Sequence, residues 1–126
     1  MKATLMVAFA VLIAAGGVGL VARAQQAGTK RTDLQRHDLS APGREMIQVR
    51  VDFDPGYVAP MHTHPGEEII YILEGTLEYE IGGKVVRVRT GDVLFVSAGT
   101  PHTARNIGGT NGAELATYVE RNRLSE

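Results

Sequence analysis

The sequence predicts an all-β fold, a sandwich or barrel of short strands, and three observations support this prediction. Apolar and polar residues alternate with the two-residue period of a half-buried strand over residues 47–53, 77–81 and 86–89. Turns rich in glycine, proline and aspartate separate the strand segments at intervals of about 8 to 12 residues. Residues 25–126 contain neither a helical pattern of useful length nor an internal repeat.

The expected strands and their connections follow from this pattern. They cover residues 45–53, 68–74, 77–81, 86–89, 93–96, 102–106 and 115–119. Residues 68–74 are apolar at neighbouring positions, so both faces of this strand should be covered. Gly82-Gly83 is the signal of a tight hairpin. Acidic side chains on one strand of this hairpin should face arginines on the other, Glu78 and Glu80 against Arg87 and Arg89.

Residues 1–24 have the layout of a secretory signal peptide. Lys2 precedes an uncharged apolar stretch, and Ala22-Arg23-Ala24 has the small residues of a cleavage site. We expect cleavage after Ala24, a periplasmic or secreted protein, and no membrane contact after cleavage. The alternative is an uncleaved helix that anchors the chain in the inner membrane, since about 20 apolar residues can span a bilayer.

The rest of the chain divides into a lead-in, one domain and a tail. Residues 25–44 are polar and are expected to be a flexible lead-in, with an edge strand at its end as the alternative. Residues 45–119 form the domain, and residues 120–126 form a charged tail. The 126-residue chain has a formal net charge of −1 and no basic patch, so nothing indicates a nucleic-acid partner.

The chain contains no cysteine, which excludes disulfides and thiolate metal ligands. A small domain without disulfides needs tight β closure, a metal ion or oligomerisation for stability. We therefore expect a homodimer, formed by sheet faces or by exchanged N-terminal strands.

Three of the four histidines lie in two clusters that suit a metal site. His62 and His64 are separated by one residue, so in a strand both point to the same face. A Pro-Gly turn lets Glu68 return to the same place, and His102 adds an imidazole from a distant strand. Three imidazoles and one carboxylate suit one divalent transition metal ion, namely Fe, Mn, Ni, Cu or Zn.

Two stretches resemble the two conserved motifs of the cupin superfamily. The first motif is matched at each fixed position, by Gly56, His62, His64, Glu68 and Gly75. The second is matched by Gly91, Gly99, His102 and Asn106, while Ser97 stands where the family usually has proline. The resemblance covers roughly residues 45–119 and is typical of small, single-domain, quercetin-dioxygenase-like bacterial members.

This resemblance implies a β-barrel of jelly-roll type, commonly dimeric, with His62, His64, Glu68 and His102 as the four metal ligands. Asn106 carries over as a motif position and not as a ligand. Ser97 should loosen the loop before His102 without contacting the metal.

Other residues receive weaker assignments. Glu67 alternates with Glu68 along a strand and should face solvent, and His37 in the lead-in is expected to be a surface residue. Seven residues are candidates to line the cavity or fill the barrel core: Phe53, Met61, Ile70, Ile72, Tyr79, Phe95 and Ala104. Their apolar bias suggests a small-molecule ligand of modest size, with the metal as its polar anchor.

Three functions are compatible with these features. The leading hypothesis is a metal-dependent oxidoreductase of the dioxygenase type that acts on a small organic molecule, with Glu68 both ligand and catalytic base. The second is a non-enzymatic periplasmic module that binds metal or a small ligand. The third is a metal-assisted isomerase or lyase. The fold alone does not decide among them.

Overall fold

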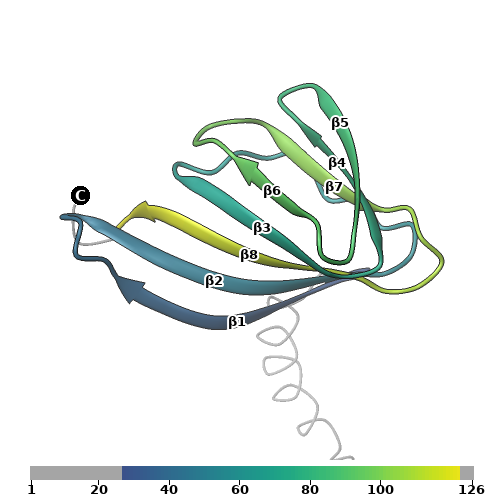
Figure 1. The fold of residues 1–126 in the computed structure, drawn as a ribbon, viewed down its shortest axis with the longest axis horizontal. Coiled ribbons are helices and arrows are strands. Elements are labelled where there is room, and N and C mark those ends of the chain that lie inside the picture. The colour runs from purple at the N-terminus through teal and green to yellow at the C-terminus, as the bar shows by residue number, and fades with distance from the viewer. Residues whose placement is uncertain (1–26, 123–126) are drawn as a thin grey trace, which may run out of the picture.

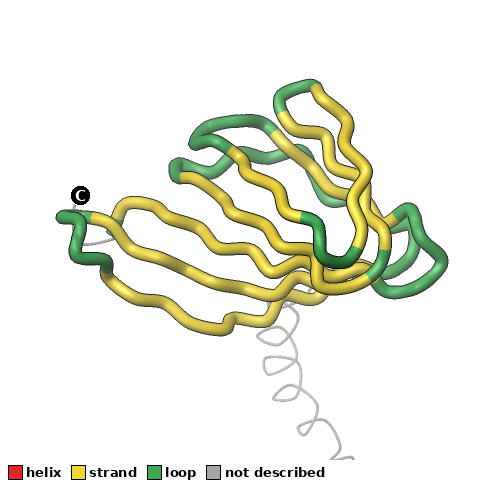
Figure 2. The backbone as a smooth tube through the Cα atoms, in the orientation of Figure 1, coloured by secondary structure: helices red, strands yellow, loops and turns green. Residues whose placement is uncertain are grey.

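The computed structural model describes residues 27–122, which form eight β-strands and no helix (Figures 1 and 2). The strands are β1 (Thr29–Asp38), β2 (Arg44–Phe53), β3 (Glu67–Glu74), β4 (Thr76–Ile81), β5 (Lys84–Arg89), β6 (Val93–Val96), β7 (His102–Asn106) and β8 (Gly112–Arg121). The all-β prediction is confirmed. The predicted signal peptide lies outside the described residues, and within residues 27–122 no helix is suited to cross a membrane.

The strands form two antiparallel sheets that face each other. The larger sheet has the order β1-β2-β8-β3-β6, and the smaller one has the order β5-β4-β7. β8 lies between β2 and β3, so the last strand of the chain closes the centre of the larger sheet. Figure 1 shows the smaller sheet over one end of the larger sheet, while β1, β2 and β8 extend beyond it. β1 and β6 form the two edges of the larger sheet.

The main hydrophobic core fills the space between the two sheets. Strand alternation places one face of each strand inward. The buried members of this core are Phe53, Ile70, Ile72, Leu77, Tyr79, Val88, Val96 and Ala104. A smaller cluster of Val49, Ala116 and Tyr118 continues along the extended part of the larger sheet. The alternation predicted for residues 47–53 is confirmed, because Val49 and Phe53 are buried.

β1 lies inside the segment that was expected to be a flexible lead-in. The edge strand named as the alternative is present, and it pairs with β2 from Thr29↔Phe53 to Asp38↔Glu45 with a bulge between Asp33 and Gln35. The sequence signal is weak because an edge strand with one exposed face needs few apolar residues. β1 carries mostly polar side chains and still completes the sheet through backbone hydrogen bonds.

The structure corrects one expectation about exposed faces. Glu78 faces Arg87 across the hairpin as predicted, and their side chains lie 2.9 Å apart. Glu80 instead faces Val85, so the second predicted pair is wrong. The outer face of β3 is not covered within residues 27–122, because Ile69 and Tyr71 are about half exposed.

Candidate metal centre

The backbone brings His62 and His102 directly opposite each other. The segment before β3 runs antiparallel to β7, and His62 and His102 exchange both backbone hydrogen bonds, with N–O distances of 3.0 and 2.9 Å. Opposed residues of this type place their side chains on the same face of a sheet. The two imidazole ring centroids consequently lie 4.3 Å apart.

His64 and Glu68 reach the same place from either side of a tight turn. Gly66 passes so close to β8 that a Cβ built on it would lie 1.9 Å from the carbonyl oxygen of Val119. This close approach starts β3 with Glu68 facing inward, opposite Tyr118 in register. Glu68 Oε2 lies 2.9 Å from His102 Nε2 and 3.5 Å from His64 Nε2.

Hydrogen bonds to the backbone orient two of the imidazoles. The Nδ1–H of His62 donates to the carbonyl of Pro60, and that of His102 donates to the carbonyl of Thr100, both at 2.8 Å. A carbonyl oxygen only accepts, so each ring keeps its proton on Nδ1 and directs Nε2 toward the cluster. Both carbonyls lie in restricted backbone, because Pro60 has a fixed φ angle and Thr100 directly precedes Pro101. This restriction helps to hold the two carbonyls in place.

The donor atoms fit a divalent transition metal ion. One ligand atom from each of His62, His64 and His102 lies within 4.8 Å of the others. Nε2 of His64 is buried and has no hydrogen-bond partner in the described chain, since its 3.5 Å contact with Glu68 is too long for one. A buried polar atom without a hydrogen-bond partner destabilises the fold, and a bound metal ion would supply the missing partner. A positive charge between Nε2 of His102 and the Glu68 carboxylate, a proton or a metal ion, satisfies both groups.

The pKa values of His64 and His102 are shifted in opposite directions by their surroundings. Burial lowers the pKa of His64, which favours the neutral, metal-binding form of this ring. The hydrogen bond from His102 to Glu68 raises the pKa of His102, because the carboxylate stabilises the charged ring. The cluster therefore combines one imidazole that resists protonation with another that is paired to a carboxylate.

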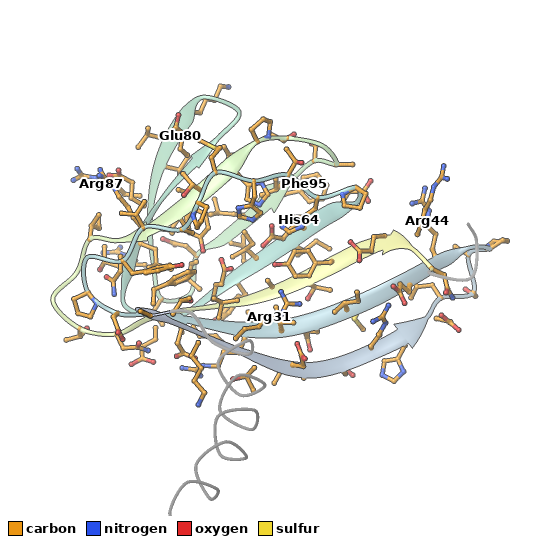
Figure 3. The ribbon with its side chains drawn as sticks, turned by 180° about the vertical axis from the view of Figure 1, so that it is seen from behind. Arg31, Arg44, His64, Glu80, Arg87 and Phe95 are labelled. Atoms are coloured by element: carbon orange, nitrogen blue, oxygen red, sulfur yellow. The ribbon has the colours of Figure 1, made fainter. Side chains whose placement is uncertain are left out.

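A cavity of about 370 Å³ opens above this cluster. Its wall includes the four predicted site residues together with residues from both sheets and from the connection between β2 and β3: Thr29, Arg31, Val51, Phe53, Tyr57, Ala59, Tyr79, Ala104, Glu114 and Tyr118. This volume lies at the lower end of the range for small-molecule sites. Figure 3 shows Arg31 on the side of β1 and His64 nearer the smaller sheet, and both line this cavity.

Glu114 and Tyr79 form a polar pair in the wall of the cavity. The Tyr79 hydroxyl donates to Oε2 of Glu114, and both side chains are buried. Burial raises the pKa of Glu114 to about 7, with the nearby Glu68 charge contributing in the same direction. Burial also raises the pKa of Tyr79. The Tyr79 hydroxyl therefore stays neutral at physiological pH, whereas Glu114 is protonated below about pH 7 and ionised above it.

The structure separates the candidate lining residues into three groups. Phe53, Tyr79 and Ala104 line the cavity, while Ile70 and Ile72 are fully buried core residues. Met61 and Phe95 are more than half exposed, so the expectation that they lie inside is wrong. Phe95 (Figure 3) lies in a run of four apolar residues. Strand alternation divides such a run between two faces, but it does not tell which face points inward.

The structure supports one of the two weaker assignments outside the cavity fully and the other in part. His37 is exposed as expected, and its only side-chain contact among the described residues is a 3.2 Å contact with Gln35. Glu67 is half-buried and alternates away from the cavity wall.

Sequence reasoning missed Arg31, Glu114 and Tyr118. The Tyr118 ring lies 4.7 Å from the His64 ring in an edge-on arrangement. Residues 114, 116 and 118 alternate along β8 with the same parity, and this pattern could have assigned them to one inward face. For Arg31 the sequence held no such signal, because its strand is mostly polar.

Comparisons with known proteins agree with this geometry. The family described as "Cupin domain" matches residues 49–118. An oxalate-binding protein from Thermotoga maritima is 31% identical over 116 residues, which are 82% of this chain and 96% of that protein. Germin-like protein subfamily 2 member 1 from Arabidopsis thaliana is 30% identical, over 64% of this chain and 41% of that protein.

A solved structure extends the comparison to a ligand complex. Recombinant oxalate oxidase in complex with glycolate is 28% identical to this chain with a TM-score of 0.61, and the match covers 79% of this chain and 54% of that one. This chain therefore spans about half or less of the germin-like protein and of the oxalate oxidase, and nearly all of the oxalate-binding protein.

Proposed function

The chain belongs to the cupin family, and on this premise we propose that it is a metal-dependent oxidoreductase acting on a small organic molecule. One observation carries the proposal: His62, His64, Glu68 and His102 converge on the wall of a cavity of small-molecule size. We assign these four side chains as the ligands of one divalent transition metal ion. When bound, such an ion supplies Lewis acidity and, if it is redox-active, electron transfer to oxygen.

The remaining residues of the site have supporting roles in this proposal. Glu68 is the carboxylate nearest the three imidazoles and the group best placed to accept a proton from a bound ligand. Tyr118 packs against His64 and limits the positions open to that ring. Val51, Phe53 and Ala104 contribute apolar wall that excludes water from the ligand.

The printed names of two similar proteins support a small oxygen-rich ligand. One binds oxalate by its name, and the other is an oxalate oxidase whose structure holds glycolate. The oxalate-binding protein also favours a second candidate function, a binding module without turnover. Its name describes binding only, and the match covers 96% of its length.

Oxygen uptake tests the oxidoreductase proposal directly. Protein loaded separately with Fe(II), Mn(II), Ni(II) or Zn(II) should be assayed in an oxygen electrode with small organic acids, flavonols and β-diketones. At least one redox-active form should consume oxygen, whereas the zinc form should not, because zinc has no redox chemistry in proteins. Glu68→Gln should keep much of the metal and lose most turnover, because an amide can ligate through oxygen but cannot accept the proton.

The same assay can also contradict the enzyme hypothesis. If no metal form consumes oxygen while these compounds still bind the metal-loaded protein, the binding module is the correct function. If neither the metal nor any of these compounds binds, both candidates fail.

A further inference from the structure

Arg31 is the only side chain with a permanent positive charge among the described residues that line the cavity. It lies on the edge strand β1, opposite Val51 in register, and Val51 is opposite Glu114 on β8. These three inward positions form one row across the sheet. Arg31 therefore lies at the edge of the larger sheet, where its side chain lines the cavity and is partly exposed (Figure 3).

Most hydrogen-bonding capacity of Arg31 is uncommitted. Its Nε donates to Asp33 at 3.3 Å, and both side chains are at least half exposed, so this ion pair is weak. Within residues 27–122 the guanidinium donates no other hydrogen bond that the structure records. Its remaining N–H groups keep the planar fork geometry that matches a carboxylate.

Tyr118 connects Arg31 to the metal-site cluster. The guanidinium carbon lies 6.0 Å from the centroid of the Tyr118 ring, and that ring lies 4.7 Å from the ring of His64. The guanidinium is therefore no farther from the His64 ring than the sum of these two distances. A metal–nitrogen bond of about 2.1 Å and a guanidinium–carboxylate contact of about 2.8 Å take up part of this span. A molecule of a few carbon atoms can fill the rest.

The charges at the two ends favour an anionic ligand. A divalent ion with one carboxylate ligand leaves a net positive charge at the cluster, and Arg31 adds a second positive charge in the cavity wall. Among the described residues that line the cavity, the only other acidic side chain is Glu114, which accepts a hydrogen bond from Tyr79. The wall also includes the apolar side chains of Val51, Phe53 and Ala104.

We infer that Arg31 is a second anchor of the ligand, and that the site selects a short dicarboxylate, one end on the metal and the other on Arg31. This inference rests on the proposed metal site and names the ligand class for it. The aliphatic middle of the ligand packs against the apolar wall. Arg31 is thus a specificity-determining residue that discriminates between dicarboxylates and monocarboxylates of the same length.

Calorimetric titration of the zinc-loaded protein tests this inference without turnover. The probes are oxalate, malonate, succinate, glutarate and adipate, each paired with a monocarboxylate of the same carbon number. At least one dicarboxylate should bind about tenfold or more tighter than its partner, the gain of one charge-assisted bidentate contact. Arg31→Gln should abolish this preference and leave zinc content and monocarboxylate affinity unchanged. Arg31→Lys should restore only part of the preference, since it keeps the charge and loses the fork.

Arg89→Gln is the matched control. It removes the same charge from an exposed position on β5, outside the cavity wall, and should leave the preference intact. An equal loss of affinity for both ligand types in Arg31→Gln, or an unchanged preference, overturns the role of Arg31 while metal-dependent binding persists. If zinc-loaded and metal-free protein bind these acids equally, the proposed metal-held ligand fails, and this inference falls with it.

Discussion

Nε2 of His102 lies 2.9 Å from Oε2 of Glu68, although the two residues are 34 positions apart in the sequence. His102 is positioned by its backbone bridge to His62, and Glu68 by the close packing of Gly66 on β8. The contact therefore joins the two sheets at the site. Any change that moves one sheet against the other separates these two atoms and should weaken metal binding.

Loss of one imidazole should lower metal content sharply. We expect purified protein to carry about one divalent transition metal ion per chain, and His64→Ala to lose most of it, because the remaining ligands cannot replace the missing bond. Elemental analysis of the two proteins measures this. His37→Ala, on the exposed face of β1, is the control and should retain the metal. Unchanged metal in His64→Ala would remove His64 from the ligand set.

Glu114 should make the metal-free protein less stable as the pH rises. The unfolded chain releases this proton near the ordinary pKa of 4.5, whereas burial holds the pKa at about 7 in the folded protein. The stabilisation is thus complete below pH 4.5 and is lost as the pH rises through about 7. The loss amounts to about 3 kcal/mol.

Glu114→Gln isolates this contribution, because the amide oxygen still accepts from Tyr79 and does not titrate. Urea unfolding of both EDTA-treated proteins between pH 4 and 8 gives the comparison. The free energy of unfolding of the wild type should fall relative to that of the variant as the pH rises. Parallel pH profiles would show that folding does not raise the pKa of Glu114.

Gly66→Ala should destabilise the protein and weaken the metal site together. The new methyl group would lie 1.9 Å from the carbonyl oxygen of Val119, so β3 and β8 must separate at the residue before Glu67. The expected cost is roughly 1–3 kcal/mol in the free energy of unfolding, with reduced metal content. Gly109→Ala is the control, since a Cβ there meets nothing within 4 Å. Equal thermal stability of the two variants would contradict this role of Gly66.

The outer face of β3 and β6 should form a homodimer contact. Ile69 faces Phe95 and Tyr71 faces Val93 in register, and all four side chains are between 45% and 68% exposed. An exposed apolar patch of neighbouring residues is a common feature of protein interfaces. Phe95→Asp should therefore shift the protein from dimer to monomer in light scattering at micromolar concentration.

Val85→Asp is the matched control for the dimer. Val85 is 62% exposed but lies on the smaller sheet, so its substitution should leave the dimer intact. A wild-type protein that is monomeric at this concentration would rule out the homodimer.

Export should be visible in the mass of the purified protein. If residues 1–24 are a cleaved signal peptide, the mature chain begins at Gln25 and fractionates with the periplasm. Intact mass spectrometry and cell fractionation measure both. A full-length chain in the membrane fraction would support the anchor alternative.

The sequence by itself determined the set of candidate metal ligands and all of the strands except β1, which it offered only as an alternative. Period-two alternation fixes which residues share a face, and it predicted the inward positions of Val49 and Phe53. The spacing of His62, His64 and Glu68 likewise placed three donors close together, because all three are local in the chain. His102 was predicted to add an imidazole from a distant strand, the family resemblance supported it as a ligand, and the structure brings all four residues together.

Only the tertiary structure decided what surrounds that cluster. Alternation defines two faces without stating which one is inner, so Phe95 was misplaced within a run of four apolar residues. Polar residues carry no burial signal of their own, so Arg31 and Glu114 were missed. Their positions depend on β1 and β8 pairing with β2, a contact between segments distant in sequence. Such pairing is set by the packing of the whole sheet, and no local pattern encodes it.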